Sequence, residues 1–235
     1  MPRWLLPFLL ALPLGAQPAA RWRVQWTPPP DRPFLIADIA FSSPQHGFAV
    51  GGQSEAILTD DGGVYWVRVP LEEPGRSIFF LSDARGWMVT EKGVWRTADG
   101  GRHWKRLCEL AGLVRVHFQD DEHGWAVGSL KSVFETKDGG VTWTEVAAAS
   151  EPKTRKKFTL YHWVHFVTPR VGVITGASIP ERKDGPPSAV PAWLDPSKAS
   201  RRPEWPTTSI VLETRDGGVT WKASTASIFG RMTRM

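Results

Sequence analysis

The stretch Thr97-Ala98-Asp99-Gly100-Gly101-Arg102-His103-Trp104 decides the fold of this chain, because its pattern is repeated. The pattern Thr-x-Asp-Gly-Gly-x-x-Trp, here called the box, occurs four times, over residues 59–66, 97–104, 136–143 and 214–221. The first three central aspartates are spaced 38 and 39 residues apart, a period typical of stacked supersecondary units such as propeller blades. The sequence therefore predicts a repeat architecture.

A second signature precedes each box: a phenylalanine is followed six residues later by a glycine. The residue two before each phenylalanine is apolar, which is the alternation of a half-buried strand. We expect one strand to end at the phenylalanine, a second to begin at the glycine, a third to run into the box and a fourth to leave it. The four pairs are Phe41 and Gly47, Phe80 and Gly86, Phe118 and Gly124, and Phe166 and Gly172.

Four short antiparallel strands in a repeat of about forty residues form the blade of a β-propeller. Within each blade the box is expected to be a tight hairpin, whose glycines accept positive φ and whose threonine and aspartate oxygens bond backbone N–H groups. The tryptophan would cover the turn. These structural roles fall to Thr59, Asp61, Trp66, Thr97, Asp99, Trp104, Thr136, Asp138, Trp143, Thr214, Asp216 and Trp221.

The boxes resemble the Asp-box, or BNR repeat, of sialidases, sortilin-type receptors and the plant and cyanobacterial photosystem II assembly and stability factor. The fuller pattern, Phe-x5-Gly-Trp-Ala-Val-Gly followed by a box ending in Thr-Trp, is most similar to the assembly-factor group of exported propellers. The resemblance covers roughly residues 34–225. It implies an all-β fold of about four recognisable blades, whereas propellers of this group serve unrelated roles.

The N-terminus has the pattern of an export signal. Met1-Pro2-Arg3 is followed by an apolar run over residues 4–14 and by Gly15-Ala16, a run too short to span a membrane. Residues 1–16 are thus predicted to be a signal peptide, and the protein to be exported, periplasmic or secreted, with no membrane span. The only cysteine, Cys108, lies outside this region, so neither a disulfide framework nor a lipoprotein anchor is expected.

The remaining chain divides at the repeats. Residues 17–33 are expected to form an N-terminal strand or linker, residues 34–227 the propeller, and residues 228–235 the start of a further blade or a tail. Two accounts of ring closure stay open. In the first, residues 22–26 supply a closing strand to a small propeller. In the second, which we favour because the tail begins like a strand, the chain is the truncated first part of a longer propeller. The blades are expected at about 34–72, 76–110, 112–148 and 158–225.

The fourth repeat holds an insertion. The interval from the glycine to the box aspartate is 14, 13 and 14 residues in the first three repeats but 44 from Gly172 to Asp216. About thirty residues, 178–207, are therefore inserted between its second and third strands, and their Pro, Ser and charged composition predicts a long loop. A basic segment at residues 153–157 precedes this blade, and both segments are expected at the end of the propeller opposite the boxes.

Charge singles out this end as the candidate binding face. Residues 151–207 carry ten basic and five acidic side chains, a net charge of +5 that equals the net charge of the whole chain. A localised positive field steers anionic partners, and exposed tryptophans are favoured anchors; a merely solvated loop is the alternative. The candidate residues are Lys153, Arg155, Lys156, Lys157, Arg182, Lys183, Trp193, Arg201, Arg202 and Trp205.

The sequence does not predict an enzyme. Sialidases with this box use a tyrosine nucleophile, a carboxylate partner and an arginine cluster, yet the chain has only Tyr65, inside a box, and Tyr161, at the start of an expected inner strand. Residues 52–56 superficially match a nucleophile elbow but lie between two expected blade strands rather than at a strand-to-helix turn. A sialidase-like glycoside hydrolase is therefore only a remote alternative.

Metal and cofactor sites are not predicted either. His162 and His165 are three residues apart on an expected strand and would point to opposite faces unless a bulge intervenes. Asp60 and Asp61 lack the alternating carboxylates of a calcium loop.

Two function classes remain. The first is a non-catalytic exported scaffold that binds a protein partner, in line with the resemblance to an assembly factor, with a general envelope or membrane-complex role rather than a photosynthetic one. The second is recognition of an anionic polysaccharide or glycan through the basic face. Nucleic acid is not an expected partner, because export separates the protein from it.

Overall fold

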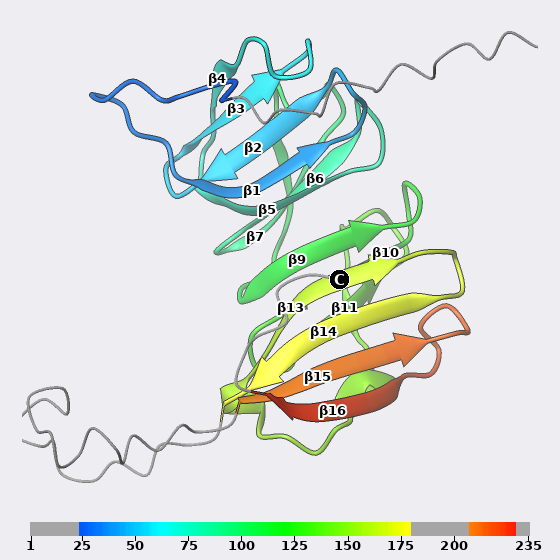
Figure 1. The fold of residues 1–235 in the computed structure, drawn as a ribbon. Helices are drawn as coiled ribbons and strands as arrows, with labels where there is room; N and C mark the ends of the chain where they lie inside the picture. Colours follow the sequence, from blue (N-terminus) through cyan, green and yellow to red (C-terminus); the bar gives the residue numbers. More distant parts are fainter. Residues whose placement is uncertain (1–23, 180–206, 229–235) are drawn as a thin grey trace, which may run out of the picture.

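The computed structural model describes residues 24–179 and 207–228, and this part of the chain forms four separate four-stranded antiparallel sheets (Figure 1). Each sheet follows the chain order of its strands, as an up-and-down blade does. Blade one contains β1 (Ile36–Phe41), β2 (Gly47–Gly51), β3 (Glu55–Thr59) and β4 (Val67–Pro70). Blade two contains β5 (Gly75–Phe80), β6 (Gly86–Thr90), β7 (Gly93–Thr97) and β8 (Lys105–Glu109).

The second half of the chain repeats this arrangement. Blade three contains β9 (Leu113–Phe118), β10 (Gly124–Gly128), β11 (Val133–Thr136) and β12 (Thr144–Glu145). Blade four contains β13 (Thr159–Phe166), β14 (Gly172–Ser178), β15 (Thr207–Thr214) and β16 (Lys222–Ile228). Two short 3₁₀ turns, η1 (Ala147–Ser150) and η2 (Lys156–Phe158), connect blades three and four. The all-β class and the strand boundaries expected from the phenylalanine, glycine and box signatures are confirmed.

The spacing of phenylalanine and glycine has a steric cause. Phe118 and Gly124 are directly opposite each other in the antiparallel pair of β9 and β10. The Phe118 ring lies over the glycine so closely that a Cβ at Gly124 would stand 2.5 Å from a ring carbon. A side chain at this position would displace the ring, which explains why each blade has glycine there.

The core consists of the interfaces between neighbouring blades. The innermost strands β1, β5, β9 and β13 contact one another in chain order. At two interfaces, an aromatic residue of the second strand stacks on the phenylalanine of the next blade: Trp87 on Phe118 at 3.8 Å and Trp125 on Phe166 at 3.9 Å between ring centroids. The tryptophan that follows the glycine of the second strand therefore packs one blade against the next at these two interfaces.

The outer face of blade one is only partly covered. Trp26 packs edge-on against Phe34 at 6.0 Å, and both residues cover Ala49 and Ile57. Residues 24–26 form no strand; Trp22 and Arg23, which begin the segment that one of the two accounts of ring closure assigns to a closing strand, lie outside the described residues. Phe41 stays 48% exposed on this face.

Several expectations fall outside the described residues. These are the signal peptide at 1–16, most of the insertion at 178–207 and the tail beyond Ile228. The ends of the insertion are described, because β14 ends at Ser178 and β15 begins at Thr207. Among the residues that the structure describes, no helix is long and apolar enough to cross a membrane.

Candidate functional site

Each box is a closed set of hydrogen bonds. In blade three, the Thr136 hydroxyl accepts from the Gly140 N–H at 2.9 Å and donates to the Asp138 carboxylate at 2.9 Å. Asp138 also accepts from the Thr142 N–H at 2.9 Å, and the Trp143 indole N–H donates to the Gly140 carbonyl at 3.0 Å. The other three boxes have the same threonine, aspartate and tryptophan bonds.

Hydrogen bonds favour the charged form of the box carboxylates. The Thr142 hydroxyl and N–H hold the pKa of Asp138 down at about 2, and Thr220 does the same for Asp216. The pKa of Asp61 is also lowered, first by the Tyr65 N–H and then by Thr59. Hydrogen bonds to the charged form lower a carboxyl pKa. These groups close turns, as the sequence predicts, and are poor candidates for proton transfer.

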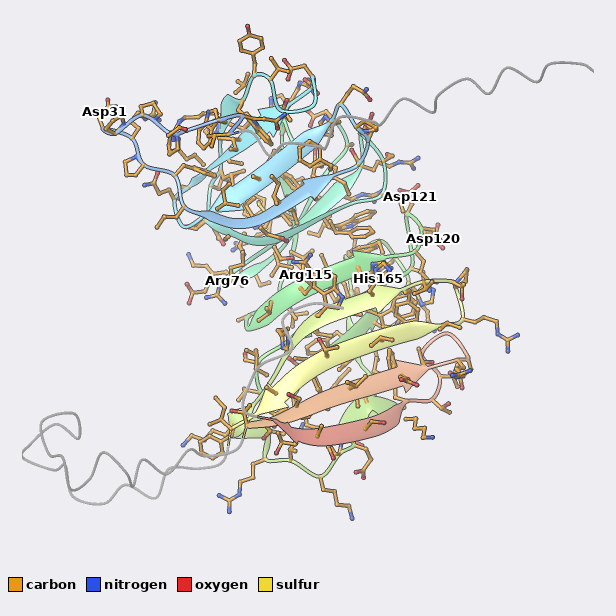
Figure 2. All side chains as sticks on the ribbon, viewed as in Figure 1. Asp31, Arg76, Arg115, Asp120, Asp121 and His165 are labelled. Carbon is orange, nitrogen blue, oxygen red and sulfur yellow. The ribbon has the colours of Figure 1, made fainter. Side chains whose placement is uncertain are left out.

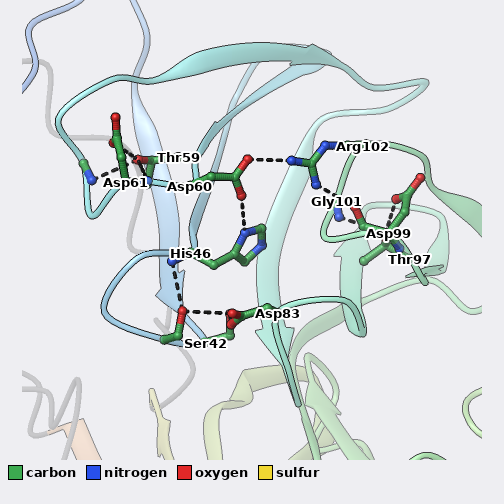
Figure 3. Close-up of polar contacts among 12 residues, drawn as sticks. Ser42, His46, Thr59, Asp60, Asp61, Asp83, Thr97, Asp99, Gly101 and Arg102 are labelled. Carbon is green, nitrogen blue, oxygen red and sulfur yellow. Dashed lines mark hydrogen bonds and ion pairs between the residues drawn. The ribbon is translucent and has the colours of Figure 1, made fainter.

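Polar contacts on the box end also join blade one to blade two (Figure 3). Asp60 accepts from Arg102 of the next box at 2.5 Å and bonds the His46 ring at 2.8 Å. Ser42 donates to Asp83 at 2.7 Å. Asp60 therefore belongs to an inter-blade contact rather than to a calcium loop.

A buried ion pair on the innermost strands was missed by sequence reasoning. Asp38 of β1 and Arg115 of β9 approach to 2.8 Å, with side chains 3% and 18% exposed. Arg115 also lies over the Trp163 ring at 4.1 Å. Figure 2 shows Arg115 and His165 in the region of β9 and β13. The signal available in the sequence was an acidic residue in one expected inner strand and a basic residue in another.

His162 and His165, the pair considered in the sequence as metal ligands, both lie in β13. The pairing of β13 with β14 shifts register between Tyr161 and Trp163, so the bulge that could have brought His162 and His165 to one face does occur. His165 nevertheless packs against the His117 ring, at 5.0 Å between centroids. Within residues 24–179 and 207–228, no group of three or more His, Cys, Asp or Glu side chains could hold a metal ion.

The candidate nucleophiles are in structural positions. Tyr161 is fully buried, and burial raises its pKa. Tyr65 is 75% exposed, and its N–H donates to Asp61 within the first box. Residues 52–54 form the turn between β2 and β3, so the match to a nucleophile elbow lies between two blade strands, as expected.

The basic connection, residues 151–158 between β12 and β13, is the described part of the candidate binding face. Its side chains Lys153, Arg155, Lys156 and Lys157 are all exposed. Lys156 lies 3.4 Å from Glu145, and Lys157 lies over the Phe158 ring at 5.6 Å. Arg182, Lys183, Trp193, Arg201, Arg202 and Trp205 lie outside the described residues.

This connection is held firmly at its base. The Thr159 hydroxyl bonds the Arg155 carbonyl at 2.9 Å and the Ser178 hydroxyl at 3.1 Å, and the Ile179 N–H donates to the Phe158 carbonyl at 2.9 Å. The start of the insertion therefore leaves the fold beside the basic connection. β11 runs from the turn at residues 129–132 to the box at its other end, so the connection and the boxes lie at opposite ends of the blade.

A hollow of about 380 Å³ lies under the basic connection. It is lined by Lys131 from the turn between β10 and β11, by Glu145 to Ala147, Ala149 and Ser150, and by residues 153–156. Lys131 is buried, and its ammonium donates to the carbonyls of Ser150 and Pro152. Sequence reasoning missed this lysine, because its role depends on the fold of a segment twenty residues away.

The four-stranded blades and their boxes define an Asp-box β-propeller. The chain belongs to the family described as photosynthesis system II assembly factor YCF48, whose sequence profile matches residues 17–112 and 109–176. This family is the one that the box and the Phe-x5-Gly-Trp pattern indicate.

Two relatives are named photosystem II assembly lipoprotein Ycf48. The protein of Trichormus variabilis is 30% identical over 253 residues, covering 80% of this chain and 73% of that protein. The protein of Synechococcus sp. (strain CC9902) is 32% identical over 119 residues, covering 45% of this chain and 35% of its own length. The chain thus spans about a third of one relative and about three quarters of the other.

Solved structures agree on the fold. YCF48 from Cyanidioschyzon merolae aligns with a TM-score of 0.55 at 19% identity, covering 84% of this chain and 58% of that one. An ancestral GH74 enzyme aligns with a TM-score of 0.52 at 14% identity, covering 84% of this chain and 28% of that one. Because both identities are low, these likenesses concern the blade architecture alone.

Proposed function

We propose that this chain is a non-catalytic scaffold that binds a protein partner through its basic connection during assembly of an envelope or membrane complex. The family supports the class of function, since two relatives are named as assembly proteins of photosystem II. The partner is inferred to present an acidic surface.

The observation that carries this proposal is the basic connection itself. It places Lys153, Arg155, Lys156 and Lys157 in solvent on a base fixed by hydrogen bonds from Thr159. Side chains on a fixed base lose less conformational freedom on binding than those on a loose loop. A cluster of one charge sign also steers an oppositely charged partner to this end of the blades.

Two further observations support a scaffold rather than an enzyme. The box aspartates are tied into turns and hold their protons only at low pH. The buried Tyr161 is withdrawn from solvent and has a raised pKa. A general acid or base works best with a pKa near the working pH, and the pKa of each of these groups is shifted away from that range.

Export is part of the proposal. The apolar run at residues 4–14, followed by Gly15-Ala16, has the composition of a secretory signal. The word lipoprotein in the names of the two relatives fits a protein that works at a membrane surface outside the cytoplasm.

The test is capture of a partner by the whole chain from detergent-solubilised membranes of the source cells, with chemical cross-linking and mass spectrometry. The test variant is Lys156→Glu with Lys157→Glu. The matched control, Lys105→Glu with Lys222→Glu, makes the same charge change at two exposed lysines that follow box tryptophans. We expect the control to retain a discrete protein partner and the test variant to lose it.

Equal capture by both variants would overturn the basic connection as the binding surface. Capture of an anionic polysaccharide, released in step with rising salt, would replace the protein partner with a glycan.

A further inference from the structure

We propose that the hollow lined by Lys131, Glu145 and residues 153–156 is a pocket for a carboxylate side chain of an acidic peptide segment. The inference rests on the proposed function, since it assigns the contact that a protein partner would make at the basic connection. It adds a defined site and a residue, Lys131, that lies outside the exposed cluster.

Lys131 is the most unusual residue of this region. It is only 8% exposed, and both it and Leu130 adopt positive φ, at +61° and +56°. Positive φ at both central residues is the geometry of a two-residue hairpin turn, which residues with a side chain adopt at some cost. Here the Lys131 N–H bonds the Thr159 carbonyl at 3.1 Å, which fixes the turn against the start of blade four.

The Lys131 ammonium is placed to bind an anion. It has three N–H donors, and two of them donate to the carbonyls of Ser150 and Pro152. The third is left for an oxygen inside the hollow. Burial lowers the pKa of Lys131, while Glu151 opposes this shift; a carboxylate in the hollow would favour the charged ammonium further.

The walls fit a short acidic side chain. Val146, Ala147 and Ala149 supply apolar lining, and the exposed Lys153 is a second cation that lines the hollow besides Lys131. An Asp or Glu side chain would place its methylene groups on the apolar side and its carboxylate between the cations. The described lining residues include no aromatic ring on which a sugar could stack, which favours a peptide over a glycan.

Glu145 acts as the pocket's own competing carboxylate. It lies 3.4 Å from Lys156, and both side chains are well exposed, at 59% and 70%. An exposed pair of this kind is weak, so a partner carboxylate can displace it. Removal of Glu145 should therefore strengthen binding, a gain that misfolding cannot produce.

The experiment titrates the whole chain with acetyl-Gly-Asp-Glu-Gly amide and follows backbone and lysine ammonium signals by NMR. The neutral control peptide has Asn and Gln in place of Asp and Glu. We expect shifts confined to residues 131 and 145–156 with the acidic peptide alone. Glu145→Gln should tighten binding about two- to threefold, and Lys153→Gln and Lys131→Met should weaken it, the latter about tenfold.

Two control variants separate the pocket from general charge effects. Glu91→Gln removes an exposed carboxylate that pairs with Arg76 at 3.6 Å in another blade, and Lys222→Gln removes an exposed lysine. Both should leave the affinity unchanged. If Glu91→Gln tightens binding as much as Glu145→Gln, the pocket proposal is overturned.

The outcomes also separate the pocket from the proposed function. If the partner is lost on reversal of Lys156 and Lys157 but the acidic peptide shifts no pocket signal, the pocket is wrong and the binding surface stands. If the peptide binds the Glu145→Gln variant, the Lys153→Gln variant and the wild-type chain with equal affinity, the pocket proposal is likewise wrong. If the variant with Lys156→Glu and Lys157→Glu captures the partner as well as its control does, the proposed function fails. The pocket proposal, which rests on that function, then fails with it.

Discussion

Asp38 of β1 and Arg115 of β9 are 77 residues apart in the chain, yet their side chains form an ion pair of 2.8 Å between blades one and three. The same Asp38 oxygen accepts the N–H of Ile78 in β5 at 3.0 Å. One buried carboxylate therefore ties the innermost strands of three consecutive blades together.

Replacement of Asp38 should consequently destabilise the whole array. Asp38→Ala removes the carboxylate that pairs with the largely buried Arg115 guanidinium, and we expect a loss of about 2 to 4 kcal/mol in the free energy of unfolding, measured by urea denaturation. Asp121→Ala, which removes the shared and more exposed partner of Arg85 and Arg96, should lose less than about 1 kcal/mol. Equal losses would show that the inner pair has no special role.

The box of blade three is expected to be separable from the binding end. Asp138→Ala removes bonds to Thr136, Val141 and Thr142 and should destabilise the chain by about 1 to 2 kcal/mol. Partner capture should be unchanged at a temperature where the variant is folded, because the box and the basic connection are at opposite ends of the blade. Parallel loss of stability and capture would contradict that separation.

The boxes also predict how stability falls in acid. The pKa values of Asp99, Asp138 and Asp216 are lowered to about 2 in the folded chain, from the ordinary value of 3.8. The unfolded chain binds more protons between these values, so their stabilising contribution is complete above about pH 4 and is lost as the pH falls towards 2. Urea denaturation across this range should show the loss of stability. The variant with Asn in place of Asp99, Asp138 and Asp216 should lose less stability over the same pH range.

His117 predicts a second, higher pH window. Its ring is 7% exposed, Nε2 accepts the Phe166 N–H at 3.2 Å, and burial lowers its pKa from 6.5 to about 4. The unfolded chain binds the proton first, so this contribution to stability is complete above about pH 6.5 and decreases down to pH 4. NMR titration should give a midpoint near 4, and His117→Gln should flatten the stability slope in this window. A midpoint above 6 would contradict the buried neutral ring.

A glycine of the second box should resist substitution. Gly101 has φ of +89°, and a Cβ there would stand 2.4 Å from the Phe48 ring of blade one. Gly101→Ala should destabilise the chain by more than about 1 kcal/mol. Gly52→Ala, where no atom lies within 4 Å of the added Cβ, should change stability by less than about 0.5 kcal/mol. Thermal denaturation of the two variants compares them directly.

Local features of the fold could be predicted because their causes are local. The box bonds join residues no more than four positions apart, as from Thr97 to Gly101, and the Phe118–Gly124 pair spans one turn. Short-range sequence patterns encode such contacts completely. The basic segment was found in the same way, from a run of charges at residues 153–157.

The pocket under that segment could not be predicted. Lys131 reads in the sequence as one more lysine in a turn, because its burial depends on the path of residues 147–153 over it. The one available signal was Leu130-Lys131 in a short turn where glycine or asparagine is usual. The role of this turn becomes clear only when residues 147–153 are in place over Lys131.

The sequence by itself determined the four-stranded blade, the box turns and the chain order of the blades, since each depends on contacts within about forty residues. The tertiary structure alone decided the contacts between distant segments: the Asp38–Arg115 pair, the buried His117 and the hollow beside Lys131. The first two join residues from different repeats, and the hollow brings a turn of blade three next to the connection that follows this blade. A one-dimensional pattern records that the repeats exist, whereas the energy of a charge or an imidazole depends on what the fold places next to it in space.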